Sequence, residues 1–212
     1  PKFTTSLWLI KLLIAIFWAL EAWCVWQLAQ ILLPKQAKTR LLFFIFNPLI
    51  LTETFIMGHN DSVMMGLFLL LLFIIFKNKI LKIWQWFIVV ALGLLSVLTK
   101  YASVVLVPFI FFKNRIDLFT WGGLVLLLVP LSRPDQLHSW YFQWGIVLLI
   151  LSKKWWGIAL AFLISVGGLL RYAPFVYFGN WDMPVPVMRN IILLIPLSVL
   201  LLPMVRNWFK QL

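Results

Sequence analysis

Charged residues are scarce in this chain, and acidic ones are scarcest. Only 11% of the 212 residues are charged, 64% are hydrophobic, and the mean hydropathy is +1.03. A soluble domain of this length needs far more charge to cover its surface, so this class is excluded. The single cysteine, Cys24, excludes an intrachain disulfide. The sequence also lacks a glycine-rich phosphate loop, which argues against ATP-driven transport.

Long apolar runs recur along the whole sequence. Runs of about 17–25 residues match the hydrocarbon thickness of a bilayer when they are helical. They do not alternate with period two, which argues against a barrel. We therefore predict an all-α, polytopic transmembrane helical bundle that forms a single domain over 1–212. The nine predicted spans, some of them short or kinked, are 6–33, 41–57, 62–76, 83–99, 101–112, 117–131, 140–152, 155–178 and 190–205.

Basic residues gather in alternate connections between these runs. Twelve of the 18 basic residues lie near residues 35–40, 77–82, 113–115, 153–154 and 206–210. The formal charge of +12 would suggest nucleic acid in a soluble protein, but short basic loops between apolar runs are a topology signal. The positive-inside rule makes this side cytoplasmic, and we expect no nucleic-acid partner.

The remaining connections have a different composition. They contain GHNDS at 58–62, Lys-Tyr at 100–101, SRPDQLHSWYFQW at 132–144 and RYAPFVYFGNWDMPVPVMR at 171–189. Asp, His, Arg, Trp and Tyr concentrate in them, so we predict a functional site on the external side.

The GHND turn is the sharpest of these features. Gly58 permits a tight turn between two apolar helices, and Asp61 could cap the second helix. A cap does not require the neighbouring His59 and Asn60, so we favour a functional turn. Asp61 would accept a proton with His59 beside it, or both would help to hold a divalent cation, although no metal-ligand set is complete. Glu53 precedes the turn and would support it from within the membrane, unless it is a protonated core residue.

Cations on the external side need a separate reason, because most basic residues lie on the other side. The candidates are Lys100, Arg133, Arg171 and Arg189. An anionic lipid headgroup is the natural ligand at this depth, and arginine binds phosphate with two parallel donors. Snorkelling to the interface is the alternative for each cation alone. Lys100 and Arg171 each precede a tyrosine, and Tyr101 joins Lys100 as a candidate.

The segment HSWYFQW carries His138, Trp140 and Tyr141. It is either an aromatic belt at the membrane interface or a surface that stacks on sugar or guides lipid.

Three segments together resemble a known family. They are NPLILTETFIMGHNDSVMMGLFLL, LSVLTKYASVVLVPFIFF and HSWYFQW, in that order. The combination is similar to the GT-C membrane glycosyltransferases, most of all to bacterial mannosyltransferase-like members that use polyprenyl-phosphate sugars. The likeness covers residues 41–145 well and the remainder only in general style.

The resemblance implies a reaction and a location. Such enzymes transfer a hexose, here mannose, from a polyprenyl-phosphate carrier to a glycan, lipid or protein acceptor on the external face of the bacterial plasma membrane. A loop carboxylate takes the acceptor's proton, and cations or a divalent metal ion help the phosphate to leave. Carried over, Asp61 matches an external-loop acid, Lys100 would lie near the carrier phosphate, and Arg171 is a looser match. His138, Trp140 and Tyr141 match the later aromatic loop.

The resemblance also implies a missing part. Members of the family carry their principal catalytic Asp in the first external loop, whereas this sequence starts at Pro1, just before the likeness of their second helix. We therefore expect that the first helix and that loop are absent and that Asp61 is a second acidic site.

Two other functions stay open at this point. A transporter or flippase of lipid-linked sugars would need polar residues to continue toward the cytoplasmic side, and a scaffold would scatter them around the perimeter. For an enzyme, we expect Asp61, Lys100, His138 and Arg171 to surround one cavity.

Overall fold

The computed structural model describes residues 7–132 and 137–201, and this part of the chain is helical throughout, with no strand. The first half contains α1 (Leu7–Leu32), η1 (Pro34–Gln36), α2 (Ala37–Ile45), α3 (Pro48–Leu51), the π-helical turn η2 (Thr52–Ile56), α4 (Asp61–Lys77), α5 (Ile83–Thr99), η3 (Tyr101–Leu106) and α6 (Val107–Phe111). The second half contains α7 (Leu118–Leu128), η4 (Val129–Ser132), η6 (Ser139–Tyr141), α8 (Phe142–Ile150), α9 (Trp155–Leu170), α10 (Ala173–Phe178), α11 (Val185–Leu197) and η7 (Ser198–Leu201).

Each predicted apolar run is helical where it is described, but the number of membrane spans is smaller by length and composition. Two helical segments are long and apolar enough to cross a membrane, Leu7–Leu32 and Trp155–Phe178. A third span arises if Pro34–Ile45 and Pro48–Ile56, bent by 42° at their break, count as one. The other apolar helices are shorter, so nine full spans are not confirmed, whereas the all-helical fold of the described residues is.

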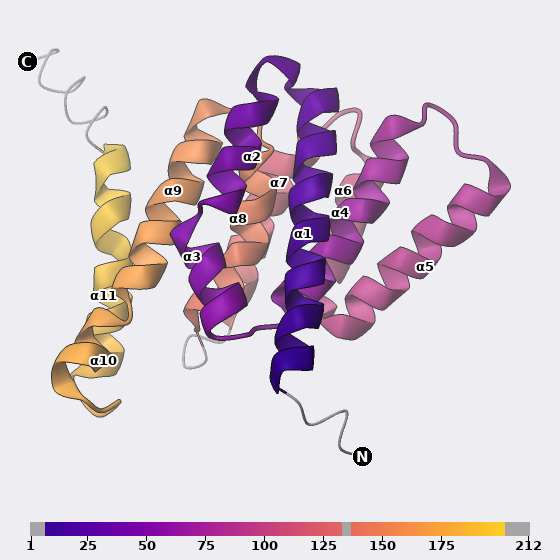
Figure 1. Cartoon of the computed structure of the whole chain (residues 1–212). Coiled ribbons are helices and arrows are strands. Elements are labelled where there is room, and N and C mark those ends of the chain that lie inside the picture. Colours follow the sequence, from indigo (N-terminus) through magenta and orange to yellow (C-terminus); the bar gives the residue numbers. More distant parts are fainter. Residues whose placement is uncertain (1–6, 133–136, 202–212) are drawn as a thin grey trace, which may run out of the picture.

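The chain runs back and forth between two ends of the bundle (Figure 1). One end, here called the basic end, carries the connections α1–α2, α4–α5, α6–α7 and α8–α9. The opposite end, called the polar end, carries the η2–α4 and α5–η3 connections and α10. The structure therefore confirms that the described parts of the polar segments lie at one end of the bundle. Arg40 departs from its predicted place in a loop, because it lies within α2 and is 3% exposed.

Close packing in the second half depends on glycine. A Cβ atom on Gly145 of α8 would lie 2.6 Å from the carbonyl oxygen of Gly123 in α7. Small residues allow such close approach between helices where lipid tails offer no hydrophobic driving force. The contact fixes α8, and with it the aromatic segment that precedes α8, against the rest of the bundle.

Polar bonds between helices hold the bent segment in place. Asn47 caps α3 by accepting from the Ile50 amide at 3.1 Å, and its side-chain amide donates to Ser165 of α9 at 2.8 Å. Arg40 donates to the Ile150 carbonyl at the end of α8, at 2.9 Å. The bend before Pro48 is thus stabilised from two sides, and it directs η2 toward the polar end.

Candidate functional site

Two unusual backbone segments bring the acidic side chains to the polar end. Residues Thr52–Ile56 form a π-helical turn, in which the Met57 amide donates to the Thr52 carbonyl at 3.0 Å. Such turns place side chains out of the regular helical register and recur at functional sites. Gly58 then adopts a φ of 76°, a left-handed conformation that a residue with a Cβ atom rarely takes. The predicted role of Gly58 in the turn is confirmed.

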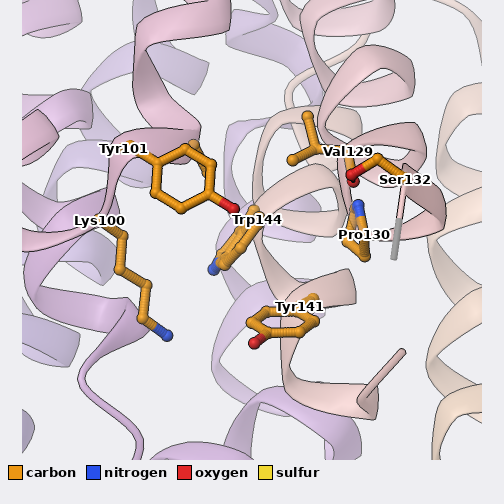
Figure 2. A pocket seen from close by; sticks show the side chains of 8 residues that line it. Lys100, Tyr101, Val129, Pro130, Ser132, Tyr141 and Trp144 are labelled. Carbon is orange, nitrogen blue, oxygen red and sulfur yellow. The ribbon is translucent and has the colours of Figure 1, made fainter. Parts of the chain in front are cut away.

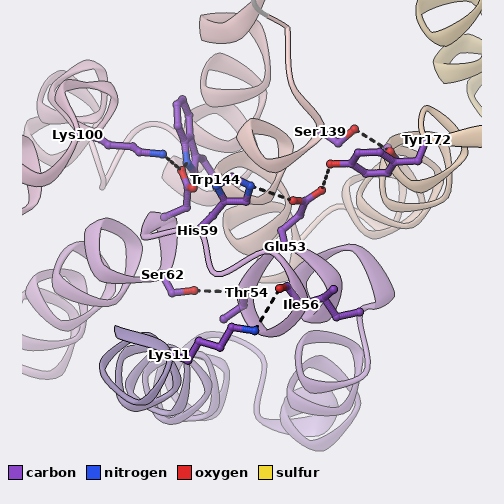
Figure 3. Close-up of polar contacts among 12 residues, drawn as sticks. Lys11, Glu53, Thr54, Ile56, His59, Ser62, Lys100, Ser139, Trp144 and Tyr172 are labelled. Carbon is purple, nitrogen blue, oxygen red and sulfur yellow. Dashed lines mark hydrogen bonds and ion pairs between the residues drawn. The ribbon is translucent and has the colours of Figure 1, made fainter. Parts of the chain in front are cut away.

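Asp61 forms a buried ion pair with Lys100 (Figure 3). The Lys100 ammonium lies 2.6 Å from Asp61 Oδ1, and Trp144 Nε1 donates to the same oxygen. The Asp61 side chain is fully buried, and its Oδ2 has no hydrogen-bond partner within the described residues. Asp61 is therefore held by α5 and α8, although it lies at the first position of α4.

This geometry changes the interpretation of Asp61. Asn60 occupies the N-cap of α4, and no side chain there caps the helix, so the alternative of Asp61 as a cap is wrong. A carboxylate with no exposed surface also does not meet a substrate in this conformation. Lys100, whose side chain is 23% exposed, is the member of the pair that a ligand can reach. Asp61 holds the Lys100 ammonium in place.

Lys100 borders a cavity of about 160 Å³, which we call the lysine cavity (Figure 2). The Lys100 ammonium lies 5.6 Å from the ring centroids of Tyr141 and Trp144, a distance at which ring faces attract cations. The wall is completed by Tyr101, Ala102, Val129, Pro130 and Ser132.

Glu53 and His59 form a second acidic centre beside the first (Figure 3). Glu53 is fully buried, and its Oε1 accepts a hydrogen bond from the Tyr172 hydroxyl at 2.8 Å. His59 Nε2 lies 3.5 Å from the other oxygen, Oε2, which is an ion-pair distance once the imidazole is protonated. Burial lowers the pKa of His59, the Asp61 carboxylate raises it, and the Lys100 ammonium lowers it again. Its side chain is 27% exposed, so His59 is accessible where Glu53 is not.

An aromatic stack joins this centre to the later loop. Trp140 lies between His59 and His138, with ring centroids 4.1 Å apart in both pairs and interplanar angles of 25° and 5°. Both imidazoles stack on the Trp140 ring in this conformation, so a sugar would have to displace one of them to stack there. Burial lowers the pKa of His138, and Arg189, Arg171 and His59 lower it further.

A second cavity, of about 460 Å³, borders this stack, and we call it the arginine cavity. Its wall contains His138, Trp140, Tyr172, Arg171 and Arg189. Arg171 is 3% exposed and donates to the Leu137 carbonyl at 2.6 Å.

The expected single cavity is therefore divided in two. Lys100 belongs to one cavity and His138 with Arg171 to the other, while Asp61 lines neither. Tyr141 lies at the boundary, because its ring packs against His138, Trp140 and Trp144 and also faces Lys100. Packed aromatic rings around Tyr141 occupy the space between the two cavities, so one shared cavity does not form.

The other predicted residues have simpler outcomes. Asn60 is exposed, and its side chain makes no hydrogen bond that the described part of the chain shows. Tyr101 is 65% exposed at the rim of the lysine cavity. Arg133 lies outside the described residues.

Sequence reasoning left two contacts unassigned. Trp144 donates to Asp61, and Tyr172 donates to Glu53. Both residues lie in segments that the sequence singled out, but their partners are 83 or more residues away. Only a fold brings such pairs together. Arg189, a candidate cation from the sequence, lines the arginine cavity.

A metal centre finds little support in this part of the molecule. Among residues 7–132 and 137–201, no three His, Cys, Asp or Glu side chains are grouped so that they could hold a metal ion.

A family model describes more than half of the chain. Residues 2–113 match the model of the alpha-(1->6)-mannopyranosyltransferase N-terminal domain. The chain belongs to this family. It is thus a member of a family of membrane glycosyltransferases, and the predicted likeness to mannosyltransferases is confirmed. The match contains Glu53, His59, Asp61 and Lys100 and ends before the aromatic loop. No curated protein and no solved structure matched the chain.

Proposed function

We propose that this protein transfers a hexose, mannose, from a polyprenyl-phosphate carrier to an acceptor at the polar end of the bundle. The observation that carries the proposal is the family match, because it contains the ion pair of Asp61 with Lys100 and the pair of Glu53 with His59. The acceptor is a glycan, lipid or protein with a free hydroxyl group.

The charge distribution supports an external site. The basic end carries short loops rich in lysine and arginine, and the positive-inside rule assigns such loops to the cytoplasm. The polar end then faces the outside of the bacterial plasma membrane. The buried carboxylates Glu53 and Asp61 flank the η2–α4 connection at that end, which suits an enzyme working at the external interface.

The chemistry requires a base and a means to stabilise the leaving phosphate. The acceptor oxygen attacks the anomeric carbon, the bond from this carbon to the phosphate oxygen breaks, and the acceptor's proton passes to a base. We assign the base to His59, which burial keeps neutral near pH 7 and which Glu53 can pair once it is protonated. The candidates for stabilising the leaving phosphate are Lys100, which Asp61 holds beside the lysine cavity, and the two arginines of the arginine cavity.

The direct test is a transfer assay with the full-length protein in membranes. Labelled polyprenyl-phosphate mannose should yield labelled acceptor, and polyprenyl-phosphate glucose should not. The variant His59→Ala should lower kcat about 100-fold, the lower range for loss of a general base. Asn114→Ala, an exposed change at the basic end, is the control and should keep full activity.

Two results would overturn parts of this proposal. Full activity of His59→Ala would show that His59 is not the base, whereas the proposed transferase activity would stand. Movement of the labelled carrier between leaflets without transfer, in the presence of a competent acceptor extract, would favour a flippase instead.

A further inference from the structure

Two arginines from different helices converge on one backbone carbonyl. Arg171 at the end of α9 donates to the Leu137 oxygen at 2.6 Å, and Arg189 in α11 donates to the same oxygen at 2.9 Å. Arg171 also donates to the side-chain oxygen of Asn190 at 3.0 Å. These acceptors are neutral, so neither contact compensates the charge of a guanidinium group.

The two cavities therefore differ in charge balance. Within the described residues, Asp61 forms an ion pair with Lys100, and Glu53 lies beside His59, with which it forms an ion pair only when the imidazole is protonated. Neither arginine pairs with a carboxylate in this part of the chain. In addition, Nε of Arg189 is buried and has no acceptor. A buried cation without a counter-charge is costly, so the arrangement favours an anionic ligand.

The surroundings also suit an anion attached to an apolar chain. His138 lies on the wall of the cavity, and its imidazole adds two donors when it is protonated. Trp181 packs against Arg189, with the guanidinium carbon 5.7 Å from the ring centroid. Pro186 and Trp181 are exposed and extend the wall toward the outside of the bundle. The cavity thus combines planar donor groups with an aromatic and apolar rim.

We propose that Arg171 and Arg189, and not Lys100, bind the phosphate group of the lipid carrier. This inference rests on the proposed function for the identity of the lipid, and it assigns the carrier phosphate to the arginine cavity. The guanidinium fork matches phosphate oxygens in pairs, whereas the Lys100 charge is already matched by Asp61 at 2.6 Å.

The test uses the full-length protein in a neutral detergent, with farnesyl phosphate as the probe and farnesol as its uncharged analogue. Titration should show saturable binding of the phosphate and much weaker binding of the alcohol. Arg189→Gln should weaken phosphate binding about 10- to 100-fold, as expected for loss of a charged hydrogen-bond donor. Lys100→Gln should change it less than threefold, and Arg115→Gln, an exposed arginine at the basic end, should not change it.

Arg189 is the primary position because it is only partly buried, whereas Arg171 supports the Leu137 backbone and its loss could unfold the site. Arg189→Lys provides a second measurement. It keeps the charge but loses the fork, so its affinity should lie between those of the wild type and Arg189→Gln.

The outcomes separate the two proposals. Loss of binding in Lys100→Gln with retention in Arg189→Gln would overturn the inference. Displacement of farnesyl phosphate by equimolar inorganic phosphate would overturn the lipid as the source of the anion. If the wild type transfers mannose and Arg189→Gln binds farnesyl phosphate as tightly as the wild type does, the inference alone is overturned. Arg189-dependent binding without transfer would overturn the proposed function alone.

Discussion

The lysine and arginine cavities lie at the same end of the bundle and are both lined by aromatic rings, yet their cations are in opposite states. Lys100 is paired with the buried Asp61, whereas Arg171 and Arg189 donate to neutral oxygens. A cation near a cavity is therefore not by itself a phosphate site. What matters is whether the fold has already supplied its counter-charge.

The largest expected effect comes from breaking the pair on the lysine side. Asp61→Asn leaves the Lys100 ammonium without its partner in a place where it is only 23% exposed. We expect the free energy of unfolding to fall by about 3 kcal/mol, as for other buried pairs that lose one member. Unfolding in detergent, followed by tryptophan fluorescence, measures the change.

The double variant Asp61→Asn with Lys100→Gln is the matched control. Removal of both charges should recover part of the lost stability, because no uncompensated charge remains. If the double variant is as unstable as Asp61→Asn, or the single variant is as stable as the wild type, the pair does not hold this side together.

A smaller effect is expected at the junction between the cavities. Tyr172 lines the arginine cavity and donates its hydroxyl to the buried Glu53 at 2.8 Å. Tyr172→Phe should lower the free energy of unfolding by about 1.5 kcal/mol, because the carboxylate loses a donor that water does not replace. Tyr177→Phe, at a side chain that is 84% exposed on α10, is the control. Equal stability of the two variants would contradict a structural role for the Tyr172 hydroxyl.

The smallest effect is a dependence of stability on pH through the Trp140 stack. Burial lowers the pKa of His59 and His138 below the ordinary value of 6.5. The unfolded state then binds protons more readily, so the stability from this stack is complete above pH 6.5 and is lost as the pH falls through the folded pKa values. Unfolding measured from pH 7.5 to about pH 5 should show the decline.

The variant His138→Gln should flatten this decline, because it removes one of the two titrating groups. An unchanged pH profile in that variant would assign the dependence to other residues.

Composition and local pattern were enough to predict the class of protein and much of its local structure. Apolar runs with so few charges can only be helices in a membrane, and the helical structure of the described residues agrees. Gly58 marked the turn, because a left-handed backbone favours a residue without a Cβ atom. The alternation of basic and polar connections also placed Glu53, His59, Asp61 and Lys100 at one end.

The pairing of these residues could not be predicted in the same way, because it depends on which helices pack together. Lys100 and Trp144 lie 39 and 83 residues from Asp61, and nothing in the local sequence specifies that one oxygen receives both donors. The same holds for Trp140 between two imidazoles and for two arginines on one carbonyl. Burial and charge balance depend on which helices pack together. In this fold Asp61, a candidate base from the sequence, pairs with Lys100, whereas the two arginines donate to a neutral carbonyl.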